Sequence, residues 1–579
     1  MKFKNIIKLS AVASLLLVGC DDMFEPQIEN NRSLETMLTE PVNAQGLMLV
    51  GYQRFNDGGT FFSDRVHEDL ATADFVCNDP EDRWMLMGRG KWQVNNNPVD
   101  KWGDVREAIQ YINIFLEKMD GVTWAQNENI NKMFADRLKG ESYALRAILN
   151  YFFLRAHAGV AGGQLLGVPI VTASENVNSD FNIPRQPFQV CVDQVFSDFE
   201  EALKYLPETY DDHTDAQVPE EYKALGIKGA DYNRVYGQYM KGRIDATIVK
   251  AMRAKFALMC ASPAFSKGCN VTWQQAADYA AQVVGGKSVV PNGHTWYNHT
   301  DEINALKDGD CPPEAIWRGD RTGDDNRDFE ASCFPPTLYG KGFINPTQNL
   351  VDAFPAANGY PISDPNSNYD KTKPFENRDP RLDLYIIHDG SVLRETTINT
   401  GSASTTRDGI NSTDASKSIT GYYLRKFMNE ECSPDPSNPQ GRRHFKPRIR
   451  YTEMFLVYAE ALNEAGNTAK AAEIMKEIRD RALGPGKDQY LPTISGNQAK
   501  MRELIHNERR IELMGENFRF WDLRRWEEPI NETIYGYDAD RGSKMSVGEL
   551  NYGSHMNYGP IPESELLKWS NLVQNDGWQ

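Results

Sequence analysis

The chain has 579 residues, of which 40% are hydrophobic and 11% aromatic, so it is long enough to bury a large core. Its formal net charge is −18, which argues against a nucleic-acid-binding protein, because such proteins usually carry a basic balance. One local basic stretch, residues 442–450, contains apolar residues between its basic ones. We therefore interpret it as a solvated or structural face.

The first residues have the pattern of a secretory signal. Lysines at positions 2, 4 and 8 accompany an apolar run that ends at Val18. That run is shorter than the roughly 20 residues of a bilayer-spanning helix and fits a signal's apolar region of about 7–15 residues. No later segment is long and apolar enough to span a membrane. The alternatives are a lipoprotein signal or an ordinary signal peptide with a chance cysteine at Cys20.

The stretch Leu17-Val18-Gly19-Cys20 resembles the lipobox of bacterial lipoproteins. This resemblance implies that residues 1–19 are a cleaved signal peptide and that Cys20 carries the acyl chains. Several buried chains, each contributing about 0.8 kcal/mol per CH₂, hold a protein on a membrane almost permanently.

The remaining seven cysteines cannot all pair within one chain, and none stands in a CxxC pair, so the sequence predicts no zinc site. A disulfide between Cys311 and Cys333 is one open possibility. Residues 320–330 have some features of a calcium loop, but Asp325 stands where that loop requires glycine. We therefore predict no metal site and no cofactor.

Apolar residues at steps of three and four predict helices. In the first of them, Ala144, Ala147, Tyr151 and Leu154 fall on one face. The predicted helical ranges are 141–159, 190–207, 249–259, 272–286, 452–467 and 468–482. Helices of this length, joined by short turns and rich in alanine at contact positions, are typical of tetratricopeptide-type pairs of about 34 residues.

A region between residues 285 and 445 is rich in Gly, Pro, Asn and Asp and contains short β-type runs at 382–388 and 421–427. The sequence therefore predicts a mainly α fold: an α-α superhelix of tetratricopeptide-like helix pairs with large irregular loops and a few short strands. Loops carried by a rigid scaffold are where binding sites tend to lie.

Motifs for catalysis are missing from the sequence, so we predict that the protein is not an enzyme. It contains no G-x-S-x-G elbow and no P-loop, and the segments 67–71 and 506–510 lack the second histidine of a zinc-protease helix. With 81 acidic residues, carboxylate pairs suited to glycoside hydrolysis carry no information.

The charged segment 508–516 is interpreted as structural. Arg509 and Glu512 stand three residues apart on a helix, where opposite charges support each other. Glu508 needs a basic partner from elsewhere in the chain. Trp521 and Trp526 are expected to pack between helices.

Several segments together resemble the SusD/RagB family of outer-membrane nutrient-binding lipoproteins. They occur in family order and extend over nearly the whole mature chain. The matching segments are the lipobox with the residues that follow it, 144–171, 185–207, 377–386, 448–466, 505–526 and 559–566. The segments "RYTEMFLVYAEALNE" and "ERRIELMGENFRFWDLRRW" are the most specific.

The resemblance implies a single domain at 20–579, with an N-terminal part at about 20–270 and a C-terminal part at about 271–579. It also implies a lipid-anchored outer-membrane protein at the cell surface that binds an oligosaccharide or polysaccharide. The implied partner is a SusC-type TonB-dependent transporter, to which the ligand is delivered. A peptide-binding protein of the same architecture, as in the RagB branch, is the alternative, and a lipid-anchored glycoside hydrolase is a third possibility.

Sugar rings present flat C–H faces that stack on aromatic side chains, while amides and charged groups bind the hydroxyls. Two non-periodic regions, 78–102 and 292–302, combine aromatic and polar residues, and a third lies near 333–343. The predicted ligand-binding residues are Trp84, Trp92, Asn95, Asn97, Trp296, Tyr297, Phe334 and Tyr339. Trp102 and Trp317 are instead predicted to lie in the core.

Overall fold

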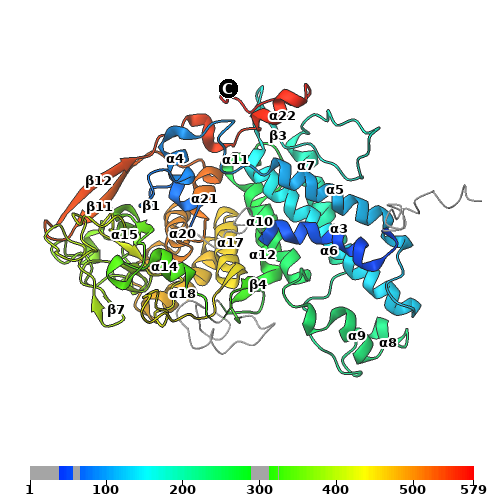
Figure 1. Ribbon diagram of the computed structural model, residues 1–579, viewed down its shortest axis with the longest axis horizontal. Helices are drawn as coiled ribbons and strands as arrows, with labels where there is room; N and C mark the ends of the chain where they lie inside the picture. Colours follow the sequence, from blue (N-terminus) through cyan, green and yellow to red (C-terminus); the bar gives the residue numbers. More distant parts are fainter. Residues whose placement is uncertain (1–37, 57–65, 289–311, 324) are drawn as a thin grey trace, which may run out of the picture.

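The computed structural model describes residues 38–56, 66–288, 312–323 and 325–579 (Figure 1). The predictions that concern Cys20, Trp296, Tyr297 and a Cys311–Cys333 disulfide therefore lie outside the described residues. Among helices within these ranges, none is both long enough and apolar enough to cross a bilayer.

A continuous array of helices forms the scaffold. Each helix contacts the next: α3 with α5, α5 with α6, α6 with α7, α7 with α10, α10 with α12, and α12 with α17, which contacts α18 and α20. Their bounds are α3 Pro41–Asn56, α5 Trp102–Lys118, α6 Glu128–His157, α7 Phe188–Leu203, α10 Ala246–Ala261, α12 Trp273–Val284, α17 Tyr451–Glu464, α18 Thr468–Leu483 and α20 Gln498–Glu512. The predicted superhelix of helix pairs is confirmed.

Local sequence explains how these helices begin and why they approach closely. The Asn127 side chain caps α6 by accepting from two backbone N–H groups, and Thr272 and Asn467 cap α12 and α18 by accepting from one backbone N–H each. At the α17–α18 turn, Gly466 has a φ of 88°, which glycine adopts at little cost. Fully buried alanines, Ala254 and Ala276 among them, line α10 and α12, which pack against each other.

Short helices and two-stranded antiparallel pairs fill the excursions from this scaffold. The helices are α4 Arg83–Leu86, α8 Glu220–Lys223, α9 Gly229–Tyr236, α11 Pro263–Ser266, α14 Asp328–Cys333, α15 Gln348–Ala353, α16 Arg381–Tyr385, α19 Leu491–Ile494, α21 Arg519–Trp526 and α22 Glu563–Lys568. The strand pairs are β1 Phe75–Cys77 with β5 Ile344–Pro346, β2 Gly159–Ala161 with β3 Gln164–Leu166, β4 Ala315–Arg321 with β10 Phe445–Arg450, β6 Ile386–Ile387 with β9 Tyr423–Leu424, β7 Val392–Leu393 with β8 Thr396–Thr397, and β11 Thr533–Asp538 with β12 Ser543–Glu549.

The predicted strand at 382–388 is only partly correct. Its first half is helix α16, and only Ile386 and Ile387 form a strand. The cause is local: Asp379 accepts a hydrogen bond from the backbone N–H of Arg381 and starts a helical turn before the apolar run can extend. In the second run, 421–427, Tyr423 and Leu424 form β9.

Two large apolar clusters divide the interior. One follows the helix array, and the other joins residues 66–99 to residues 333–578. Trp102 and Trp317 are buried, as predicted. The segment 66–99 thus packs with the C-terminal part of the chain, although it precedes most of the array in sequence.

A buried network of ion pairs centres on α20. Glu508 binds Arg381 and Arg479, which confirms that its partners come from elsewhere. The predicted pairing of Arg509 with Glu512 is wrong, because Arg509 binds Asp522 on α21 at 2.9 Å.

Glu512 instead contacts Arg381, Arg450 and Arg481. Burial alone would raise the pKa of Glu512, but these arginines hold it well below its usual range. Arg450 lies at the end of the basic stretch 442–450 and is buried, so this part of the stretch is structural, as interpreted.

Candidate functional site

Trp92 was predicted to face a ligand, and the structure contradicts this. Its side chain is 2% exposed and meets the ring of Trp578 edge-on at 5.0 Å. The indole N–H donates to Oδ1 of Asn97 at 2.8 Å, and the Arg524 guanidinium lies 5.2 Å from the ring centroid. Burial lowers the pKa of Arg524 to about 10. Trp92 is therefore a core residue, held by aromatic and cation–π contacts.

Trp84 and Phe334 are also buried, which corrects their assignment. Trp84 lies on α4, whose first turn is capped by Asp82, and its ring stacks on His67. Phe334 is fully buried in the cluster that contains β1 and β5. A run rich in tryptophan and asparagine looked like an exposed loop, but its aromatic residues fill the core beneath that loop.

The two predicted asparagines have different surroundings. Asn97 is half-buried, and its side-chain oxygen binds Trp92 and the backbone N–H of Val99, so it stabilises the loop. Asn95 is exposed in the turn between Gln93 and Asn96. Only Asn95 keeps a surface position suited to a ligand contact.

Tyr339 is exposed on a surface that three separate segments form. After β1, the Asn78 side chain donates to the carbonyl of Lys341 at 2.7 Å. On the other side, Arg407 donates to the carbonyl of Pro336 at 2.7 Å. We call the segments 78–83, 335–342 and 404–417 together the loop face.

The backbone of Tyr339 is strained, with a φ of 64°, and 52% of the residue is exposed. Left-handed backbone at a bulky residue costs free energy and clusters at functional sites. The structure thus brings the first predicted loop region, at Asn78, against the third, at Lys341. Tyr339 is the predicted aromatic residue that remains exposed within the described ranges.

Sequence reasoning missed a hollow of about 200 Å³ beside the N-terminal end of α5. Its walls come from α5, the segment 169–183 and the region of α22. Phe181 and Trp569 stack there with ring centroids 6.1 Å apart and planes 25° apart. The lining residues are Trp102, Gly103, Arg106, Pro169, Phe181, Ile183, Glu565, Trp569 and Leu572.

Hydrogen bonds fix the two rings relative to each other. The Asn182 side chain donates to the hydroxyl of Ser570 at 3.0 Å and accepts from the backbone N–H of Asn571 at 2.8 Å. Phe181, next to Asn182, is therefore tied to the segment that carries Trp569. Such a preformed site binds a ligand without the cost of ordering its walls.

Charged groups stand at the edge of this hollow. Arg106 donates to both oxygens of Glu175 at 2.9 Å, and Glu565 binds Lys568 at 2.6 Å. Two aromatic rings with charged hydrogen-bonding groups beside them match the chemistry of a sugar site.

The signals for Phe181 and Trp569 in the sequence are weak. Phe181 is an isolated aromatic in the polar loop "SENVNSDFNIP", and Trp569 follows α22 near the chain end. They are 388 positions apart, so no sequence window contains both. Only the fold shows that they form one surface.

Two family models match the chain. Residues 313–578 match the SusD family, and residues 29–222 match a family described as starch-binding and associating with the outer membrane. The chain belongs to the SusD-like family. Proteins of the SusD-like family bind carbohydrate and associate with the outer membrane. In this chain, both matched regions contribute residues to the walls of the hollow.

Relatives and solved structures agree with this assignment. SusD-like protein P38 of Formosa agariphila is 24% identical over 93% of this chain and 95% of its own length. A crystal structure of a SusD-like protein from Bacteroides fragilis superposes with a TM-score of 0.71 at 21% identity, covering 96% of this chain and all of that one. A second B. fragilis structure, called a SusD-like carbohydrate binding protein, has a TM-score of 0.69 at 20% identity, with 93% of this chain and all of that one covered.

Proposed function

We propose that this SusD-like protein is a cell-surface lipoprotein that captures an oligosaccharide and delivers it to a SusC-type TonB-dependent transporter. The observation that carries the binding step is the hollow with Phe181 and Trp569. Its stacked rings present apolar faces to a sugar ring, and Arg106 and Glu565 stand within reach of hydroxyl groups. The carbohydrate-binding character of the family supports the choice of ligand.

A glycan is longer than one hollow, so a second contact surface is expected. Tyr339 on the loop face is 52% exposed, and Asn78 belongs to the same face because its side chain donates to the carbonyl of Gly342. We propose that Tyr339 stacks on a further sugar unit and that the hollow supplies the principal contact.

The attachment and partner follow from the sequence and the family. We propose that Cys20 is lipidated after removal of residues 1–19 and holds the protein on the outer membrane. The family description, which names outer-membrane association, supports this location. The helix array, the tetratricopeptide-like side of the molecule, is proposed to face the transporter.

The binding proposal is tested by calorimetry of the purified protein against a panel of polysaccharides and oligosaccharides. For the glycan that binds, we expect Phe181→Ala and Trp569→Ala each to weaken binding by about 1–2 kcal/mol, because each removes one stacking surface. Tyr339→Ala is expected to have a smaller effect. Tyr239→Ala is the control, since Tyr239 is 91% exposed and belongs neither to the lining of the hollow nor to the loop face.

Three results would contradict this assignment. Unchanged affinity in both Phe181→Ala and Trp569→Ala would remove the hollow from the binding surface. Binding of peptides with no binding of any glycan would instead support the peptide-capturing alternative. Sustained release of reducing ends from a glycan by purified protein would support a hydrolase.

A further inference from the structure

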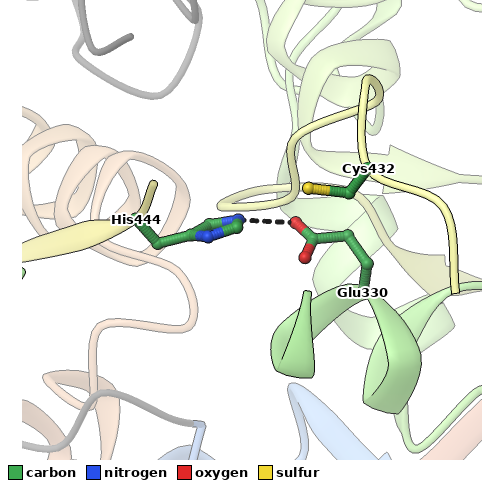
Figure 2. A group of neighbouring side chains, drawn as sticks. All are labelled: Glu330, Cys432 and His444. Atoms are coloured by element: carbon green, nitrogen blue, oxygen red, sulfur yellow. Dashed lines mark hydrogen bonds and ion pairs between the residues drawn. The ribbon is translucent and has the colours of Figure 1, made fainter. Parts of the chain in front are cut away.

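Three side chains with metal-binding atoms converge beside the loop face (Figure 2). Glu330 lies on α14, Cys432 follows β9, and His444 directly precedes β10. One donor atom from each residue lies within 4.8 Å of the other two. The thiol, carboxylate and imidazole groups point toward one another from three different segments.

Backbone contacts hold these groups in place. One oxygen of Glu330, Oε1, accepts from the backbone N–H of Asn429 at 2.8 Å. The backbone N–H of His444 donates to the hydroxyl of Thr322 at 2.8 Å. Cys432 donates its backbone N–H to the carbonyl of Asn429 at 3.0 Å. Outer contacts of this kind orient metal ligands.

The cluster contains a buried polar atom that lacks a partner. Glu330 and Cys432 are fully buried, and the second carboxylate oxygen, Oε2 of Glu330, has no hydrogen-bond partner. In the part of the chain that the structure describes, Glu330 forms no ion pair with lysine or arginine; its ion-pair contact is Nε2 of His444 at 2.8 Å. A buried carboxylate without a fixed cation is costly.

We propose that Glu330, Cys432 and His444 bind one Zn²⁺ ion. Thiolate sulfur, imidazole nitrogen and carboxylate oxygen are the ligands that Zn²⁺ prefers, and a water molecule completes four-coordination. The charges balance, because one thiolate and one carboxylate neutralise a divalent ion. This proposal departs from our sequence-based prediction of no metal site.

The geometry needs only a small adjustment. Ligands at about 2.0–2.3 Å from a tetrahedral zinc ion lie about 3.3–3.7 Å from one another. The donor atoms already lie within 4.8 Å, and Nε2 of His444 is 2.8 Å from Glu330. On binding, Nε2 exchanges its hydrogen bond for the metal, and the imidazole proton resides on Nδ1. Glu330 uses its unpartnered oxygen, while Asn429 continues to hold the other.

Metal binding is coupled to proton release. Burial, and the negative charge of Glu330 beside it, raise the pKa of the Cys432 thiol to about 12, so the thiol is protonated without metal. Binding converts Cys–SH and Zn²⁺ to a Cys–S–Zn bond and one proton that passes to solvent. Arg442 lies close to the cluster, but its guanidinium binds Glu431 at 2.6 Å.

The test uses purified protein that has been treated with a chelator and then titrated with zinc chloride in a calorimeter. We expect one Zn²⁺ per chain, and a rise of the melting temperature by several degrees at saturating zinc. Cys432→Ser, His444→Ala and Glu330→Gln should each weaken binding at least about 100-fold. Replacement of zinc by Co²⁺ should give a thiolate-to-cobalt charge-transfer absorption that Cys432→Ser abolishes.

Cys269→Ser is the matched control. Cys269 is partly exposed, and a hydrogen bond from Cys260 lowers its pKa, so it is a thiol that could bind zinc adventitiously. The proposal predicts that this variant keeps full affinity. Absence of stoichiometric zinc binding by the unmodified protein would overturn the proposal and leave a hydrogen-bonded triad. Binding that survives both Cys432→Ser and His444→Ala would also overturn it, as would a cobalt complex without charge transfer.

Discussion

Replacement of Trp92 by alanine separates a core role from a ligand-binding role. The side chain is 2% exposed, meets Trp578 and Tyr552 edge-on, and donates to Asn97. Its removal leaves a cavity beneath the loop and deprives Asn97 of its indole partner. Buried Phe or Trp to Ala changes cost about 3–5 kcal/mol, and we expect about 4 kcal/mol here, because aromatic contacts and a hydrogen bond are lost together.

The expected change in melting temperature follows from the size of the chain. An unfolding entropy of about 2.1 cal/mol/K per residue gives about 1.2 kcal/mol/K for a folded chain of 579 residues. A loss of about 4 kcal/mol therefore lowers the melting temperature by about 3–4 °C if the chain unfolds as one unit. Differential scanning calorimetry measures this shift, and Tyr239→Ala should change the melting temperature by less than about 0.5 °C.

The affinity for glycan gives the second readout. It is measured by titration of the same samples at about 20 °C or more below the melting temperature, where the fold is intact. We expect Trp92→Ala to keep its affinity for glycan. An unchanged melting temperature together with lost affinity would refute the reasoning, because it would mean that the ring of Trp92 contacts the ligand directly.

Three further perturbations test other parts of the structure. Glu512→Gln leaves buried arginines without their carboxylate and should reduce the free energy of unfolding by about 3–5 kcal/mol. Urea titrations measure this loss, and a loss below about 1 kcal/mol would contradict the stabilising role of the buried ion pairs. Burial raises the pKa of Glu460, but the charges of Arg525 and a second arginine outweigh burial and lower this pKa from 4.5 to about 2. The contribution of the ionised Glu460 carboxylate to the free energy of unfolding should therefore be fully present above pH 4.5 and should fall as the pH falls toward 2. Calorimetric melting temperatures across that range check this, and an unchanged melting temperature would contradict it. Cys20→Ala should release the protein from membranes in cell fractionation, and continued sedimentation with membranes would show another attachment.

The helical scaffold could be predicted because its signals are local. Ala144, Tyr151 and Leu154 lie on one face at helical spacing, and all three are buried in α6. The segment 382–388 was misassigned because apolar periodicity does not reveal the helical turn that Asp379 starts at α16. Periodicity located the helices correctly, although α6 begins at Glu128, well before the predicted range 141–159. The short apolar run after a turn was ambiguous.

The candidate site could be predicted only in part, because exposure is a property of the fold. Trp92 and Tyr339 both stand in polar, non-periodic sequence, yet the first is buried against Trp578 and the second is exposed. The partner that decides the burial of Trp92 lies 486 positions away. For the same reason, no local pattern pairs Phe181 with Trp569.

The segment 66–78 has a consequence for how the chain acquires its structure. Asp74 forms an ion pair with Arg510, 436 residues further along, and Asp69 accepts hydrogen bonds from the backbone of Asn517 and Arg519. Contacts of such long sequence separation form late, because a large loop must close before they contribute. While the chain is being synthesised, this segment exposes apolar surface that is covered completely only when the last part of the chain is present. A nascent chain that stops short of α21 would therefore be a substrate for proteases and chaperones, even with its N-terminal helices already formed.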